Sequence, residues 1–127
     1  MIGKLSLIML IVKDMDRSVA FYHEVIGLTV QIHTPFWSSL GSGNIVLGLH
    51  PESEHSKFAP GTGCTFGFEV ADIQQTAADL KAKGVKFLME PKREDFGWLA
   101  VIADPDGYTV QLGQTEAWAK PSTEQKT

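Results

Sequence analysis

Cysteine is almost absent from this chain of 127 residues, which has only Cys64. A single cysteine cannot form a disulfide within the chain or supply the paired thiolates of a zinc ribbon, so we expect a reduced protein of the cytoplasm. Long apolar runs are also missing, because the longest candidate, Leu5 to Val12, falls far short of the roughly 20 residues that cross a bilayer. The sequence therefore predicts no membrane partner.

Basic residues are fewer than acidic ones. Eleven Lys and Arg against fifteen Asp and Glu give a formal net charge of −4 with neutral His. Nucleic-acid binding depends on cations that neutralise phosphates, so this balance argues against a nucleic-acid partner. Apolar residues, in contrast, are plentiful: 43% of the chain is hydrophobic and 20% is charged. That composition can offset the entropy lost on folding and indicates a globular protein.

Two segments of the chain share one helical pattern. Each has three apolar residues at the spacing of a helical face: Met15, Val19 and Tyr22 in the first, and Ile73, Ala77 and Leu80 in the second. An Asp precedes each segment and can cap a helix, and a Gly follows each and can close it. The spacing predicts helices over Asp14–Gly27 and Asp72–Gly84.

Short apolar runs surround both helices, one before and three after, with turn residues between them. The predicted strands are 7–12, 28–33, 36–40 and 45–50 in the first half, and 65–70, 85–89, 98–103 and 108–113 in the second. The predicted fold class is α+β: two tandem βαβββ modules that form a curved mixed sheet with a concave cleft and helices on its outer face. We expect one domain over 1–127, with modules at about 4–50 and 64–113, a linker at 51–63 and a polar tail at 114–127.

Three motifs carry a family resemblance: Val12-Lys-Asp-Met-Asp-Arg-Ser-Val-Ala-Phe-Tyr22, Ile26-Gly-Leu28 and Asp104-Pro-Asp-Gly-Tyr108. With the tandem βαβββ order over roughly residues 4–113, they resemble the vicinal oxygen chelate superfamily, which includes glyoxalase I, bleomycin resistance proteins and extradiol dioxygenases. The order and spacing of the motifs are specific for the fold. Most of their residues have structural roles, as helix caps and turns.

The resemblance implies four places for metal ligands, on the first and last strand of each module. In this chain those places hold Leu7, Gly48, Thr65 and Gln111. Only Gln111 can coordinate, whereas a catalytic metal needs about three protein ligands. We therefore expect no cofactor. A divalent metal is expected only at a non-standard site that combines Gln111 with His50, His33 or Glu69.

The concave face is where we expect a ligand. Phe36 and Trp37 are predicted on the third strand of the first module, and Phe96 and Trp98 at the equivalent place in the second; they would form an apolar slot or pack at a subunit interface. No residue pattern marks a covalent nucleophile, so the catalytic residues are unknown. The candidate ligand-binding residues are Phe36, Trp37, His50, Thr65, Glu69, Trp98 and Gln111.

Three functions fit this sequence. In the first, the protein binds a small apolar or aromatic molecule in a metal-free cleft. In the second, it is a metal-dependent lyase or dioxygenase of the glyoxalase type with a non-standard site. In the third, it is a structural or regulatory partner whose cleft is filled. Because one helix cannot cover both faces of a four-stranded sheet, the two halves must share a core or pair with a second chain, and we expect a homodimer.

Overall fold

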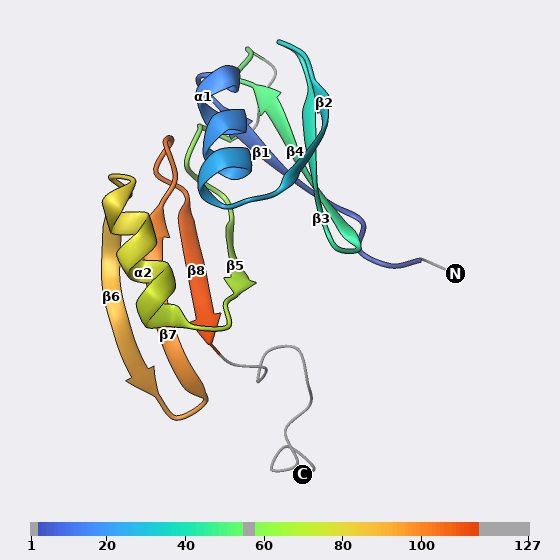
Figure 1. Cartoon of the computed structure of the whole chain (residues 1–127). Coiled ribbons are helices and arrows are strands. Elements are labelled where there is room, and N and C mark those ends of the chain that lie inside the picture. Colours follow the sequence, from blue (N-terminus) through green and yellow to red (C-terminus); the bar gives the residue numbers. More distant parts are fainter. Residues whose placement is uncertain (1–2, 55–57, 115–127) are drawn as a thin grey trace. The chain divides into compact units, whose positions relative to one another are not determined.

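The computed structural model describes residues 3–54 and 58–114 (Figure 1). Beyond Gln114, the predicted polar tail lies outside the described residues. No helix within the described ranges is both long and apolar enough to cross a membrane.

The elements follow the order βαβββ twice. The first module contains β1 (Leu7–Val12), α1 (Met15–Ala20), the π-helical turn η1 (Phe21–Val25), β2 (Thr29–His33), β3 (Ser38–Ser42) and β4 (Ile45–Pro51). The second contains β5 (Thr65–Glu69), α2 (Ile73–Ala82), β6 (Phe87–Glu94), β7 (Gly97–Ala103) and β8 (Thr109–Gln114). The predicted fold class and the tandem βαβββ order are confirmed.

Each module forms its own four-stranded mixed sheet, in the order β1-β4-β3-β2 or β5-β8-β7-β6. The first strand pairs in parallel with the last strand, and the other neighbours are antiparallel. A parallel pair cannot be joined by a tight turn, so the chain must cross over between its members. The first and last strands of each module, far apart in sequence, therefore lie side by side.

The two helices begin and end as the sequence predicts. The carboxylates of Asp14 and Asp72 each accept a hydrogen bond of 3.1 Å from the backbone N–H three residues later. Gly27 and Gly84, with φ of 97° and 78°, occupy the left-handed conformation after the last turn. The predicted apolar faces are at most 9% exposed: Met15, Val19, Tyr22, Ile73, Ala77 and Leu80.

Each helix covers one face of its sheet. Contacts of α1 reach β4, and those of α2 reach β6, β7 and β8. The strand side chains that alternate toward the helices form the two cores: Leu10, Leu40, Leu47 and Leu49 in the first, and Ala100, Ile102, Val110 and Leu112 in the second. We call the opposite face of each sheet its open face.

Two strands, β3 and β6, differ from the predicted ranges by more than one residue at an end. Phe36 and Trp37 precede β3, because the Thr34 hydroxyl accepts hydrogen bonds from their backbone N–H groups at 3.3 and 3.0 Å and holds them in a turn. Strand β6 continues through Pro91 to Glu94. Proline is tolerated there because β6 is an edge strand with a shifted register.

The chain divides into two compact units. One comprises Met1–Cys64 together with Asp104–Tyr108, and the other comprises Thr65–Ala103 together with the chain from Thr109 onward. The loop between β7 and β8 therefore belongs to the first unit, although both of these strands belong to the second.

Candidate functional site

The open face of the first sheet is apolar. Met9, Gly48, Ser39 and Ile32 lie opposite one another on β1, β4, β3 and β2, so their side chains share this face. Leu7, Met9 and Ile32 are 44%, 48% and 47% exposed, high values for large apolar side chains. No helix covers this row, which leaves a hydrophobic surface available for contact.

The ring of Trp37 lies over Gly48 on this open face. A Cβ atom at Gly48 would lie 2.3 Å from Cη2 of Trp37 and 3.0 Å from Cδ1 of Leu7. Real side chains do not approach so closely, so the ring occupies the space that any side chain at position 48 would need. The turn at Thr34 also holds the backbone of Trp37 in place, because the Thr34 hydroxyl donates to the Trp37 carbonyl at 2.8 Å.

A pocket of about 320 Å³ lies on the open face of the second sheet, lined by Thr65, Phe66, Gly67 and Gln111. Gly67 stands opposite Gln111 in the parallel β5–β8 pair. The Thr65 hydroxyl donates to the Thr109 carbonyl at 3.1 Å, and Glu69 is exposed two residues beyond Gly67 on the same face. Three of the predicted ligand-binding residues, Thr65, Glu69 and Gln111, thus share one face.

The two strand histidines lie on different faces of the first sheet. His50 pairs with Ile11 and alternates with Gly48, so it lies on the open face, where its Nδ1 is 2.8 Å from the Pro51 carbonyl oxygen. His33 lies on the helix side, where its Nε2 is 2.8 Å from the Asp16 carboxylate of α1. His33 is therefore not a residue of the open face of its own sheet.

The two predicted aromatic pairs are not equivalent. Trp98 lies opposite Gln114, whose side-chain carbonyl accepts from the backbone N–H of Ile73 at the start of α2. Trp98 therefore shares the helix side of its sheet with Ala100 and Ile102, whereas Trp37 lies on an open face. Phe36 and Phe96 are in turns, 77% and 46% exposed. The pairing expected from the sequence fails because Trp37 lies in the turn before β3 whereas Trp98 lies on β7, so the two residues do not hold equivalent places.

The four places where the resemblance implies metal ligands do not fit a divalent ion. Leu7 offers hydrocarbon, and Gly48 has no side chain and no room for one. Thr65 offers a hydroxyl that already donates to a backbone carbonyl, and Gln111 offers one neutral amide. Divalent transition metals require several imidazole, carboxylate or thiolate ligands. Within residues 3–54 and 58–114, no three His, Cys, Asp or Glu side chains converge elsewhere.

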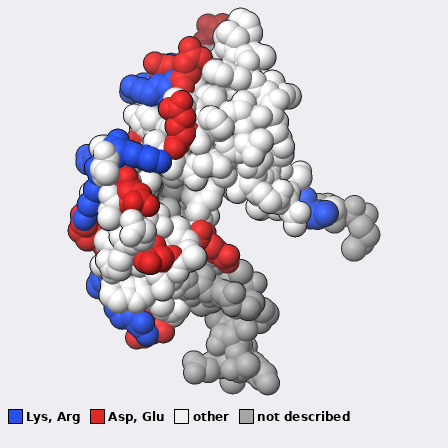
Figure 2. Space-filling view, in the orientation of Figure 1, with Lys and Arg blue, Asp and Glu red and all other residues white. Residues whose placement is uncertain are grey.

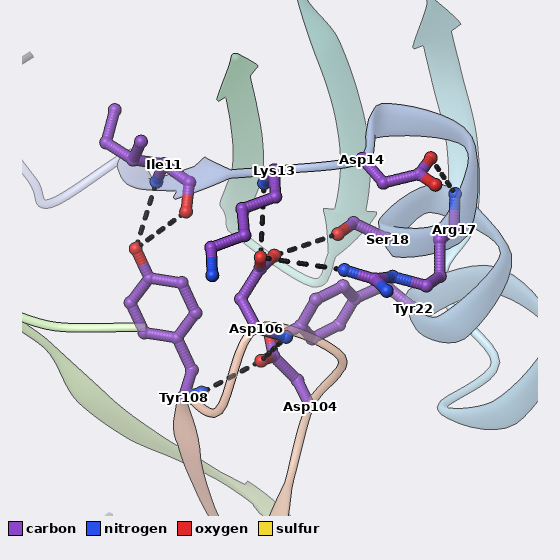
Figure 3. Close-up of polar contacts among 9 residues, drawn as sticks. All are labelled: Ile11, Lys13, Asp14, Arg17, Ser18, Tyr22, Asp104, Asp106 and Tyr108. Carbon is purple, nitrogen blue, oxygen red and sulfur yellow. Dashed lines mark hydrogen bonds and ion pairs between the residues drawn. The ribbon is translucent and has the colours of Figure 1, made fainter. Parts of the chain in front are cut away.

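A buried polar cluster, which the sequence predicted only as a helix face and a turn, joins α1 and η1 to the β7–β8 loop (Figure 3). The Tyr22 hydroxyl donates to Asp104 Oδ2 at 2.7 Å. Asp104 Oδ1 accepts from the backbone N–H groups of Asp106 and Tyr108 at 2.9 and 2.8 Å. The Tyr108 hydroxyl accepts from the Ile11 N–H at 3.1 Å and donates to the Ile11 carbonyl at 2.9 Å. These bonds attach the loop to the first unit.

Burial sets the protonation behaviour of this cluster. Desolvation raises the pKa of Asp104 despite the three donors that favour its charged form. It also raises the pKa of Tyr22 and of Tyr108, which stay protonated as donors. The neighbouring Asp106 carboxylate accepts from the Lys13 N–H at 3.1 Å and from the Ser18 hydroxyl at 3.3 Å. The carboxylates are engaged in holding the loop, so we assign the cluster a structural role.

Solved structures share this fold, and their descriptions name an antibiotic binding protein and a lactoylglutathione lyase among them. UcmS2 superposes with a TM-score of 0.77 at 24% identity, covering 91% of this chain and 100% of that one. TnmS3, described as an antibiotic binding protein from Streptomyces sp. CB03234, gives 0.76 at 24% identity over 90% of this chain and 97% of its own. A lactoylglutathione lyase from Agrobacterium tumefaciens gives 0.70 at 20% identity over 87% and 92%. These similarities establish the fold.

Curated relatives extend the similarity to sequence. A protein of Synechocystis sp. named "Probable lactoylglutathione lyase" is 31% identical over 124 residues, which cover 86% of this chain and 93% of that protein. An Arabidopsis thaliana protein named "Probable lactoylglutathione lyase, chloroplastic" is 34% identical over 115 residues, 80% of this chain. The chain spans only 33% of this plant relative and 44% of a second one.

A family model described as Glyoxalase/Bleomycin resistance protein/Dioxygenase superfamily matches residues 4–112, almost all of both modules. With the tandem βαβββ fold and this match, the chain belongs to the glyoxalase/bleomycin resistance protein/dioxygenase superfamily.

Proposed function

We propose that this protein binds a small apolar or aromatic molecule on its open sheet faces, without a metal. The observation that carries the proposal is the ring of Trp37 over Gly48, which puts an aromatic surface at a place where the family resemblance implies a metal ligand. The exposed side chains of Leu7 and Met9 extend that apolar surface. The description of TnmS3, a structural neighbour, as an antibiotic binding protein supports the same class of function.

The pocket on the open face of the second sheet would supply polar contacts to a ligand bound on that sheet. Its wall combines the Thr65 hydroxyl with the Gln111 amide, which can both donate and accept. A few polar groups on a mainly apolar surface orient a ligand, while the apolar area supplies most of the affinity. We assign Trp37 and His50 to ligand contacts on the open face of the first sheet. On the open face of the second sheet we assign them to Thr65, Glu69 and Gln111, and not to Trp98, whose side chain lies on the helix side.

Replacement of Trp37 by Ala is expected to weaken the binding of an aromatic probe such as naphthalenemethanol. A buried aromatic anchor contributes roughly 1 to 3 kcal/mol to binding, which is a loss of about 5- to 160-fold in affinity. Isothermal titration calorimetry measures the change without relying on the altered fluorescence.

The matched control for this experiment is Trp98→Phe, a change of the same residue type on the helix side. It should leave the affinity of the probe unchanged. If the probe does not bind to the unaltered protein, or if Trp37→Ala binds it with full affinity, the open face of the first sheet is not the ligand site.

A second candidate function is that of a metal-dependent lactoylglutathione lyase, which the name of the Synechocystis relative favours. The side chains at the four implied ligand places argue against it, because Leu7 and Gly48 offer no donor atom and the other two offer only a hydroxyl and an amide.

A thermal-shift series with divalent metals on chelator-stripped protein separates the two candidates. A metal present at about 100 times its dissociation constant would add about 2.7 kcal/mol, which is several degrees for a chain of this size. We expect no shift with zinc, nickel, iron or manganese. A shift that disappears in Gln111→Ala would instead support the lyase and make dicarbonyl compounds the next substrates to assay.

We also propose that two copies of the chain associate. Each sheet has a helix on one face only, and Ile32 is 47% exposed on the edge strand β2, at the opposite edge of the first sheet from the Leu7 and Met9 surface that we assign to the ligand. Light scattering at micromolar concentration tests the association, and a clean monomer would contradict it.

A further inference from the structure

We infer that the ligand of the second sheet carries a planar amide group, such as a lactam, whose adjacent N–H and C=O groups pair with the side-chain amide of Gln111. The inference rests on the proposed binding function and concerns only the pocket on the open face of the second sheet. The residues that line this pocket all belong to the second unit.

Within the described residues, the side-chain amide of Gln111 has no hydrogen-bond partner. Gln111 lies on β8, and the facing positions of the two neighbouring strands hold Gly67 on β5 and Val101 on β7. Neither residue has a polar side-chain atom. In the described part of the chain, no polar side-chain atom is both fully buried and without a partner, so the amide of Gln111 is open to solvent. Its donor and its acceptor are both available to a ligand.

The pocket places free space beside this amide. Its volume is about 320 Å³, and Thr65, Phe66, Gly67 and Gln111 line it. Gly67 presents only backbone atoms, so no side chain of β5 fills the position that faces Gln111. Ligand pockets measure roughly 300 to 1,000 Å³, so this one accommodates a group of one or two rings. A planar ring over Gly67 has its edge beside the Gln111 amide.

The charges of the second module do not line this pocket. In Figure 2 its charged side chains gather over α2 and β6. The four described residues that line the pocket are uncharged. A charged ligand group would lose its hydration there without gaining an opposite charge. A neutral polar group is therefore the better match.

Among neutral groups, an amide fits the side chain of Gln111 at two points. The side-chain amide offers an N–H donor and a C=O acceptor on one edge and in one plane. A lactam offers an acceptor and a donor at the same spacing, so the two groups form two hydrogen bonds together. Rotation of the Gln111 amide by half a turn exchanges its donor and acceptor, so either order in the ligand is matched. An ether or an isolated carbonyl forms only one of these bonds.

Carbostyril, a bicyclic aromatic lactam, and N-methylcarbostyril test the inference, because they share the rings and the carbonyl and differ at the N–H group. We expect isothermal titration calorimetry to show that carbostyril binds about tenfold more tightly, the size of one hydrogen bond. Gln111→Leu, which keeps a side chain of similar size, should remove this preference. A preference caused by the bulk of the methyl group would persist in that variant.

Two further variants complete the test. Gln75→Leu removes a side-chain amide of the same unit, one that donates to Asp79 on α2 at 2.9 Å, and it should preserve the preference for carbostyril. Gln111→Glu should bind benzamidine more tightly than the unaltered protein does. The two N–H groups of the amidinium pair with a carboxylate, a gain that misfolding cannot produce.

The outcomes separate the inference from the function on which it rests. If naphthalenemethanol binds but carbostyril has no advantage over N-methylcarbostyril, the inference is overturned while the binding function stands. The same holds if the preference persists in Gln111→Leu, or if Gln111→Glu brings no gain for benzamidine. If neither naphthalenemethanol nor either lactam binds to the unaltered protein, the proposed function itself fails.

Discussion

Asp104→Ala is expected to lower the free energy of unfolding by about 3 to 5 kcal/mol. The change removes the acceptor of three hydrogen bonds, from the Tyr22 hydroxyl and from two backbone N–H groups. Asp104 is 5% exposed and Tyr22 is 0% exposed, so water cannot readily replace the lost partner. Each buried donor left without an acceptor costs roughly 1 to 3 kcal/mol. Urea denaturation followed by circular dichroism measures the loss.

Two further variants serve as comparisons for Asp104→Ala. Tyr22→Phe removes one of the three donors and should cost about 1.5 to 3 kcal/mol, as expected for a hydrogen bond to a charged group. Asp95→Ala, in the exposed turn between β6 and β7, should change stability by no more than about 0.5 kcal/mol. A loss below about 1 kcal/mol for Asp104→Ala would show that the cluster does not hold the loop.

The same carboxyl group gives the stability a dependence on pH. Because burial raises the pKa of Asp104 in the folded state, the folded protein binds a proton more readily than the unfolded chain does. At a pH below the pKa of Asp104 in the unfolded chain, the carboxyl group is protonated in both states and folding buries no charge. At a pH above its pKa in the folded protein, the group is ionised in both states and the full cost of burying the charge lowers the free energy of unfolding. The free-energy difference between the unaltered protein and Asp104→Asn should therefore shift in favour of the unaltered protein as the pH falls through this window.

Gly48→Ala is expected to cost about 1 to 3 kcal/mol of stability, the usual penalty of an added methyl group in a packed site. The new Cβ would lie 2.3 Å from Cη2 and 2.9 Å from Cζ3 of Trp37, so the indole ring would have to leave its place. A displaced ring meets more water, and the tryptophan emission should shift to longer wavelength. Chemical denaturation and fluorescence measure the two effects.

The control for the Gly48 prediction is Gly41→Ala on the neighbouring strand. Its Cβ would meet only the end of the Gln31 side chain, with Nε2 at 2.9 Å and Cδ at 3.6 Å. The end of an exposed Gln side chain moves aside easily, so we expect little change in stability. In a Trp37→Ala background the cost of Gly48→Ala should also fall below about 0.5 kcal/mol. Equal costs with and without the indole ring would show that the ring does not occupy this space.

The sequence predicted which face of the sheet three of the candidate residues share. Period-two alternation assigned Thr65, Glu69 and Gln111 to one face, and the structure has them on the open face of the second sheet. The expected equivalence of Trp98 with Trp37 was wrong, because it assumed that both aromatic residues lie on matching strands. Trp37 is in the turn that Thr34 holds, and a turn has no period that fixes the direction of its side chains.

By itself the sequence determined the two helices, their caps and the tandem βαβββ order, because periodicity, capping and turn residues act between neighbours in the chain. Only the tertiary structure decided that the ring of Trp37 covers Gly48 and that the Tyr22 hydroxyl donates to Asp104. Those contacts join Trp37 to Gly48 and Tyr22 to Asp104, and they depend on strand register and on side-chain packing across the fold. A local pattern carries no information about such pairs, because their members meet only when the sheet and the β7–β8 loop have formed.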